Sequence, residues 1–226
     1  MASLPPRGLT FIIFIFSFGA EKLSFSFRSQ YDGYIYPKWK KKDGVSGLFY
    51  EDSVVVGKDF MVLGDGLGGA EGISGVFSVH QFLNIAMALK TCVPNDVTDV
   101  TKAVVDASDE AVLSLGLPVI DKTMSDVATT LVYMKLKENM LYSGVIGDSG
   151  FSIYRYNPDS KIMELIRRSK EKVHGFNTPY AVTSDRIDNP DVYEDEVKQG
   201  DVVIVASDGV LDVLPSSFLT AATNYL

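Results

Sequence analysis

The sequence predicts an α+β domain built on antiparallel sheets, and three observations along its 226 residues point to it. Two β-branched runs form a hairpin in the first third, two helical segments follow, and strand patterns return after residue 126. Strands in two clusters separated by a helical pair are typical of α+β domains. A chain of this length is expected to form one domain with a sizeable core.

The first twenty residues admit two interpretations. Arg7 precedes LTFIIFIFSFGA, an apolar stretch that is short for a membrane span and ends in small residues, as a signal peptide does. In that case residues 1–20 are a targeting segment for the secretory route or an organelle such as the mitochondrion, and the domain is 21–226. The same FIIFIF run is equally suited to a buried first strand, in which case the protein is cytoplasmic.

The first hairpin brings acidic residues together. The runs EDSVVV (51–56) and FMVLG (60–64) flank a turn at Gly57-Lys58-Asp59. If the turn centres on Lys58, Asp52 lies opposite Gly64 and Glu51 lies opposite Asp65. Three carboxylates are therefore expected at the open end of this hairpin.

Two helices are expected next. Residues 70–92 carry apolar residues at helical spacing, and Pro94 follows. A second helix is predicted from Val97 to about Leu115, with Asp96 as its N-cap.

The second half of the chain returns to strands. Residues 126–136, 140–147 and 151–157 are predicted to form an antiparallel meander, in which Thr129 and Thr130 face Asp148. KIMELI is a further strand candidate, Asp185 to Glu196 is expected to be a charged loop, and residues 201–215 contain a buried strand that ends in Asp208.

Composition excludes several classes of function. The net charge of -8 provides no basic stripe for a nucleic acid, since only Lys38, Lys40, Lys41 and Lys42 cluster. The single cysteine, Cys92, forms no internal disulfide and no cysteine-based zinc cluster, and its neighbours predict a buried thiol. A membrane contact is expected only through the N-terminal segment, and nothing in the sequence fixes an oligomeric state.

An aspartate between small residues follows an apolar strand three times, in Gly64-Asp65-Gly66, Gly147-Asp148-Ser149 and Ser207-Asp208-Gly209. Each instance alone is typical of a turn or a cap. Together they predict like charges at one sheet edge, a costly arrangement unless a cation lies among them. Oxygen ligands suit Mg²⁺ or Mn²⁺ rather than zinc.

The order of motifs resembles the metal-dependent serine/threonine protein phosphatases, the protein phosphatase 2C-like (PPM) family. The resemblance runs from about Leu23 to the C-terminus, and it looks most like a branch, including some mitochondrial members, with an apolar residue inside Asp-Gly-X-Gly-Gly. It implies a sandwich of two antiparallel sheets flanked by helical pairs (αββα). The motifs are Glu51-Asp52, DGLGG (65–69), ATT (128–130), IGDSG (146–150) and VIVASDGVLD (203–212).

The resemblance also implies a set of metal ligands. Asp65 would bridge two ions, and Gly66 would bind through its carbonyl oxygen. Asp208 would bind the first ion and would also face a third, weaker site, which Asp148 would serve. Mg²⁺ or Mn²⁺ is the implied metal.

The chemistry implied by the resemblance is hydrolysis of phosphoserine or phosphothreonine in a protein substrate. Glu51 and Asp52 would orient metal-bound waters from behind the ligands. A water held between two ions would attack the phosphoryl group, and no enzyme side chain would become phosphorylated. Asp65 and Asp208 would be the carboxylates at the reacting centre.

Three departures from the family pattern stand out. Leu67 occupies the X position, where many relatives carry a histidine that protonates the leaving alkoxide, a contribution worth roughly two to four orders of magnitude. The stretch VSGLFYED has no phosphate-binding arginine, and no cation is nearer than Lys42. The chain reaches Leu226 without the family's last strand-aspartate motif, which predicts a domain that is incomplete at its C-terminus.

Two rival functions remain open from the sequence. A catalytically weak or dead pseudophosphatase would bind phosphoproteins or a regulatory partner without turnover. GDSG (147–150) is also a fragment of a serine-protease motif with Ser149 as nucleophile. The protease is disfavoured because His80 lies within a predicted helix and Phe151 replaces a further glycine.

Overall fold

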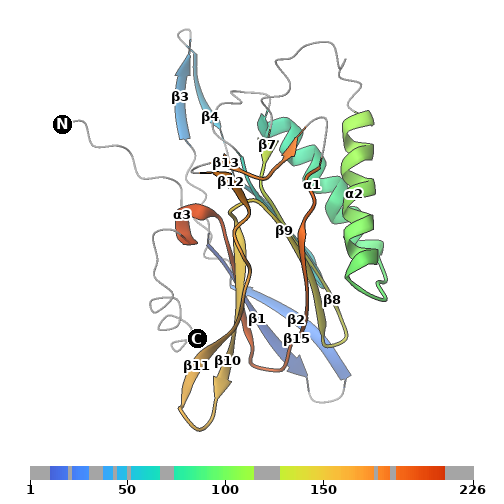
Figure 1. Cartoon of the computed structure of the whole chain (residues 1–226), viewed down its shortest axis with the longest axis vertical. Coiled ribbons are helices and arrows are strands. Elements are labelled where there is room, and N and C mark those ends of the chain that lie inside the picture. Colours follow the sequence, from blue (N-terminus) through green and yellow to red (C-terminus); the bar gives the residue numbers. More distant parts are fainter. Residues whose placement is uncertain are drawn as a thin grey trace, which may run out of the picture.

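Two five-stranded antiparallel sheets pack face to face, and two helices cover the outside of one of them (Figure 1). This is seen in a computed structural model. It describes residues 11–19, 22–30, 38–42, 45–49, 52–66, 74–114, 128–175, 178–183 and 187–211. The predicted α+β class with antiparallel sheets is confirmed.

The sheet under the helices, here called the helix-covered sheet, has the order β15-β9-β8-β6-β5. All its neighbouring strands are antiparallel. Its strands are β5 (Asp52–Val56), β6 (Phe60–Asp65), β8 (Leu131–Lys137), β9 (Met140–Ile146) and β15 (Asp191–Glu196).

The other sheet, here called the second sheet, has the order β11-β10-β16-β1-β2. Its strands are β1 (Phe11–Gly19), β2 (Lys22–Gln30), β10 (Gly150–Asn157), β11 (Ile162–Arg168) and β16 (Val202–Ala206). Three short pairs complete the described strands: β3 (Lys38–Lys42) with β4 (Val45–Phe49), β7 (Ala128–Thr129) with β14 (Val182–Thr183), and β12 (Val173–Gly175) with β13 (Thr178–Pro179).

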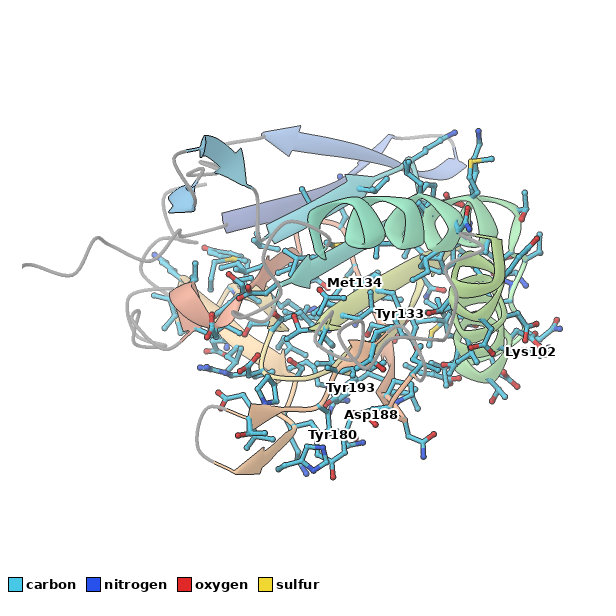
Figure 2. All side chains as sticks on the ribbon, turned by 90° about the horizontal axis from the view of Figure 1, so that it is seen from above. Lys102, Tyr133, Met134, Tyr180, Asp188 and Tyr193 are labelled. Atoms are coloured by element: carbon cyan, nitrogen blue, oxygen red, sulfur yellow. The ribbon has the colours of Figure 1, made fainter. Side chains whose placement is uncertain are left out.

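The core has two layers because successive side chains of a strand point to opposite faces. Met134 belongs to the apolar cluster between the two sheets, with Leu63 on one side and Val203 on the other. Its neighbour Tyr133 belongs to the cluster between the helix-covered sheet and the helices. Figure 2 shows both side chains inside the ribbon, whereas Lys102 lies on the outer helical side.

The two helices, α1 (Ser74–Thr91) and α2 (Val97–Ser114), pack on this sheet through Ile85 and Leu89 of α1 and Val100 of α2. The predicted N-cap is confirmed, because the Asp96 carboxylate accepts hydrogen bonds from the amides of Thr98 and Asp99. Within the described ranges this is the one helical pair, beside the short α3 (Asp208–Leu211). No helix in the described part of the chain is long and apolar enough to cross a membrane.

The predicted hairpin is confirmed, but its register was wrong by one residue. Asp52 pairs with Asp65, and Ser53 pairs with Gly64. The reason is a two-residue loop, Lys58-Asp59, closed by a 2.8 Å hydrogen bond from the Gly57 amide to the Phe60 carbonyl. Glu51, expected opposite Asp65, lies outside the described residues.

The predicted three-strand meander was also wrong in its last step. β8 and β9 pair as expected, but β10 leaves for the second sheet and pairs with β16 and β11. The crossing is made by Gly147-Asp148-Ser149, where Gly147 has φ 101°, a backbone conformation that favours glycine.

Part of the predicted charged loop is a strand. β15 pairs with β9 along its whole length and forms one edge of the helix-covered sheet. Tyr193 and Asp195 face inward, while Val192, Glu194 and Glu196 are exposed. Charges on the solvent side are typical of edge strands and concealed the alternation in the sequence.

The FIIFIF segment forms most of β1, which lies between β16 and β2 in the second sheet. Phe11 pairs with Ala206, at the end of β16 that precedes Asp208. The targeting role of residues 1–20 and the domain limits 21–226 stay predictions.

Candidate metal centre

Asp65 ends β6, and two threonines hold its backbone. Its amide donates a hydrogen bond to Thr130 Oγ1 at 3.0 Å. Its carbonyl accepts one from the Thr130 amide at 2.9 Å and another from Thr129 Oγ1 at 3.1 Å. The position of this half-buried aspartate is therefore fixed by the end of β7 and the residue before β8, rather than by its own hairpin alone.

Gly66 continues the same edge. It forms an isolated antiparallel bridge with Thr129 and is buried. The motif residues Asp65 and Gly66 are thus anchored to the ATT motif, although 64 residues separate Asp65 from Thr129. Leu67, which follows, lies outside the described residues.

Asp148 lies in the crossing between the two sheets, beside the threonines. A Cβ placed on Gly147 would stand 2.7 Å from Thr130 Cγ2 and 2.8 Å from the Tyr180 carbonyl oxygen, so the loop packs closely against both. The Gly147 carbonyl accepts a 2.8 Å hydrogen bond from the Lys172 amide. Asp148 itself is half-buried.

Asp208 reaches the same edge through the second sheet. β10 and β16 are antiparallel and pair Gly150 with Ala206, so Asp148 lies two residues before one partner and Asp208 two residues after the other. Asp208 opens α3, whose first turn is closed by the Ser207 carbonyl. The strand thus ends at Ala206, not at Asp208 as the sequence predicted.

The structure therefore brings Asp65, Asp148 and Asp208 to one edge of the sandwich, where the chain passes between the sheets. The register adds Asp52 opposite Asp65. Within the described ranges, no group of three or more histidine, cysteine, aspartate or glutamate side chains stands close enough to hold an ion. What the structure contains is the backbone frame of the site.

This frame fits a hard divalent cation in its donor chemistry. The carboxylates are half-buried rather than sealed, and oxygen donors of this kind suit Mg²⁺ or Mn²⁺. At the same edge, the buried Ser207 hydroxyl has no hydrogen-bond partner within the described part of the chain. A buried polar atom of this kind is usually satisfied by water or a ligand.

Sequence reasoning missed the part played by two hydroxyls. Thr130 was expected to pack against Asp148 or to hydrogen-bond to its carboxylate, which stays a prediction; the structure shows in addition that Thr130 Oγ1 accepts a hydrogen bond from the Asp65 amide and lies 2.7 Å from Ser149 Oγ. Ser149, considered as a protease nucleophile, is fully buried in this contact. One sequence signal could have revealed this role. Thr130 directly precedes β8 and Ser149 directly precedes β10, so both hydroxyls lie where a strand begins at this edge.

A cluster of polar and aromatic side chains around Lys172 flanks the Gly147 turn. Lys172 Nζ contacts Asp191 Oδ1 at 2.9 Å and the Asn189 carbonyl at 2.8 Å, and it lies 5.2 Å from the Tyr180 ring centroid. Tyr180 stacks on His174 at 3.8 Å. These contacts tie the β12–β13 hairpin to β15 beside the candidate site.

The sequence is similar to known phosphatases. It is 30% identical over 174 residues to the protein phosphatase PTC7 homolog fig of Drosophila mojavensis, covering 70% of this chain and 52% of that protein. It is 32% identical over 120 residues to the protein of the same name from Drosophila melanogaster, covering 48% and 35%. The chain thus spans about half or less of the curated relatives it matches. No family model matches the sequence.

Solved structures share the fold. The serine/threonine phosphatase PstP/Ppp of Mycobacterium tuberculosis superposes with a TM-score of 0.59 at 23% identity, covering 76% of this chain and 77% of that one. The PstP catalytic domain in complex with two manganese ions gives a TM-score of 0.61 at 18% identity, covering 94% and 85%. PppA of Pseudomonas aeruginosa gives 0.53 at 19% identity, covering 76% and 75%.

Proposed function

We propose that this chain, which is homologous to the PTC7 protein phosphatases and has the fold of the PPM serine/threonine phosphatases, hydrolyses phosphoserine and phosphothreonine esters in proteins with the aid of Mg²⁺ or Mn²⁺. The observation that carries this proposal is the arrival of Asp65, Asp148 and Asp208 at one edge of the sandwich. Aspartates on three neighbouring segments are the kind of oxygen donors that a hard divalent cation would need at this edge.

The proposed roles are those that the resemblance to the PPM phosphatases implies for these positions. Asp65 and the Gly66 carbonyl would hold two ions, Asp208 would complete the first site, and Asp148 would serve a third. Asp52, opposite Asp65, would orient water from behind the ligands, together with Glu51. Two bound ions would supply an activated water and positive charge near the phosphoryl oxygens.

The chain's own contribution is to hold these groups in place. Thr129 and Thr130 fix the Asp65 backbone through three hydrogen bonds. With Leu67 at the usual histidine position, no side chain there can protonate the leaving alkoxide, so water supplies that proton. The proposed hydrolysis would then depend on the bound ions and on ordered water, and no side chain of the protein would act as a nucleophile.

The test is hydrolysis of phosphoserine and phosphothreonine peptides with and without Mn²⁺. Turnover should appear with Mn²⁺ and vanish with a chelator. Asp65→Asn should lower kcat/KM by about two orders of magnitude or more, because it removes a charge that faces the metal. Asp106→Asn, which alters an exposed carboxylate of α2, should leave kcat/KM unchanged. Turnover that ignores both the chelator and Asp65→Asn would overturn the proposal.

A pseudophosphatase is the second candidate, and Leu67 is the observation that favours it. It would bind phosphopeptides without hydrolysing them. Assays on this chain, and on a chain extended with any downstream coding sequence that the gene contains, separate the two functions. Phosphopeptide binding without turnover in both forms would establish the binding module in place of the enzyme.

A further inference from the structure

We infer that Thr130 and Ser149 are positioning residues that set the spacing between Asp65 and Asp148, and this inference rests on the proposed function. Thr130 Oγ1 and Ser149 Oγ lie 2.7 Å apart. Thr130 also accepts the hydrogen bond of the Asp65 amide, and Ser149 follows Asp148 directly in the chain. One hydroxyl pair thus connects the two acidic segments.

The pair bridges the sheets at the point where they are joined. Thr130 precedes β8 of the helix-covered sheet, and Ser149 precedes β10 of the second sheet. The main chain between them runs out along β8, back along β9 and through the Gly147 crossing. The hydroxyl contact is a direct link across that path, so the spacing of Asp65 and Asp148 does not depend on the long route alone.

Burial makes this link stiff. Both side chains are fully buried, and a hydrogen bond in such surroundings is stronger than in water. Removing one partner leaves the other hydroxyl buried without a replacement from solvent. Because Thr130 Oγ1 also holds the Asp65 amide, a displaced Thr130 side chain moves the end of β6 as well.

The chain offers a matched hydroxyl pair away from the edge. Thr101 Oγ1 of α2 lies 2.8 Å from the Tyr133 hydroxyl, so Thr101→Val removes a contact of the same kind and nearly the same length. It alters the packing of a helix on the same sheet but none of the acidic segments. The change in the free energy of unfolding of Thr101→Val measures the effect of losing one such hydroxyl contact by itself.

The experiment measures Mn²⁺ binding calorimetrically for the full chain carrying Thr130→Val, Ser149→Ala, both substitutions, or Thr101→Val. Removing a group that orients a metal ligand typically weakens affinity by 10–100-fold, so each edge substitution should raise the Mn²⁺ Kd roughly tenfold. The double variant should be little weaker than either single one, because both remove the same link. Thr101→Val should bind Mn²⁺ as the wild type does.

Thr130→Ser keeps the hydroxyl and should retain the wild-type Kd, which separates positioning from packing. Wild-type affinity in Thr130→Val and Ser149→Ala, or fully additive losses in the double variant, would overturn the inference. If Thr130→Val does not fold, Ser149→Ala and Thr130→Ser decide it. A wild-type chain that binds Mn²⁺ but hydrolyses no phosphopeptide would overturn the proposed function alone, whereas one that binds no Mn²⁺ would overturn both.

Discussion

At the scale of single residues, Tyr133 shows how one side chain joins a sheet to a helix. The ring is fully buried in β8, and its hydroxyl contacts Thr101 of α2. Gly144 on the paired strand makes room for it, since a Cβ there would stand 2.1 Å from Tyr133 Cζ. Burial raises the pKa of Tyr133 to about 12, against a smaller lowering by the Thr101 hydrogen bond.

This raised pKa predicts alkaline destabilisation. The unfolded tyrosine loses its proton near pH 10 and the folded one near pH 12, so between these values the unfolded state holds fewer protons. The stabilising contribution of Tyr133 to the free energy of unfolding is fully present below pH 10 and is lost as the pH rises to about 12. The expected loss is about 2 to 3 kcal/mol. Urea unfolding between pH 8 and 11.5 measures it, and Tyr133→Phe should flatten that part of the curve.

The exposed Tyr156 provides a control for the removal of a phenol hydroxyl. Tyr156→Phe should change the free energy of unfolding at pH 8 by no more than about 0.5 kcal/mol. An equally steep alkaline loss in Tyr133→Phe would show that Tyr133 does not carry it.

At the scale of elements, an ion pair fastens β10 to the start of β16. Arg155 Nε and Nη2 donate to the two carboxylate oxygens of Asp201 at 2.8 and 2.7 Å, and Nη2 also reaches the Glu196 carbonyl. The Asp201 side chain is fully buried, while that of Arg155 is 27% exposed. The hydrogen bond to Asp201 is the largest cause of the raised pKa of Arg155. Such bidentate geometry fixes strand position as well as charge.

Asp201→Asn should therefore lower the free energy of unfolding by about 2 to 3 kcal/mol. It leaves the Arg155 charge without its partner and weakens the bond from the Lys198 amide to Asp201. Chemical denaturation measures the loss. Asp106→Asn breaks the exposed pair with Lys102 in α2 and should cost at most about 0.5 kcal/mol. Equal losses in the two variants would contradict this account of β16.

At the scale of the whole molecule, the candidate site lies where the chain leaves one sheet for the other. Gly147 allows that crossing through its positive φ and through its close approach to Thr130 and Tyr180. The same short segment carries Asp148, so the joint between the layers and the proposed ligand are one piece of backbone.

Gly147→Ala should accordingly lower both stability and Mn²⁺ affinity. The strained φ costs about 1 to 2 kcal/mol, and the added methyl displaces Thr130 or the Tyr180 carbonyl. Gly200 has φ 85° with nothing within 4 Å of an added Cβ, so Gly200→Ala isolates the backbone cost. It should lose stability without weakening Mn²⁺ binding in a calorimetric titration. Unchanged Mn²⁺ affinity in Gly147→Ala would show that the backbone crossing at Gly147 does not position the metal site.

Local signals predicted much of this fold. The two helices, the Asp96 N-cap and the first hairpin lie where periodicity and capping residues indicate them. These features depend on neighbours a few residues apart, so the sequence contains all the information they need. The order of the acidic motifs likewise pointed to Asp65, Asp148 and Asp208 before their positions were known.

By itself, then, the sequence determined which segments form helices and most of the strands. It also determined which aspartates follow apolar strands and are candidates for binding a metal ion. Only the tertiary structure decided that Asp52 pairs with Asp65, that β10 leaves β9 for β16, and that the Asp191–Glu196 segment is an edge strand. The Thr130–Ser149 contact belongs to the same group. The physical reason is that strand pairing joins residues far apart in the chain, and a one-residue change in a loop or a sheet crossing alters every partner while leaving local patterns unchanged.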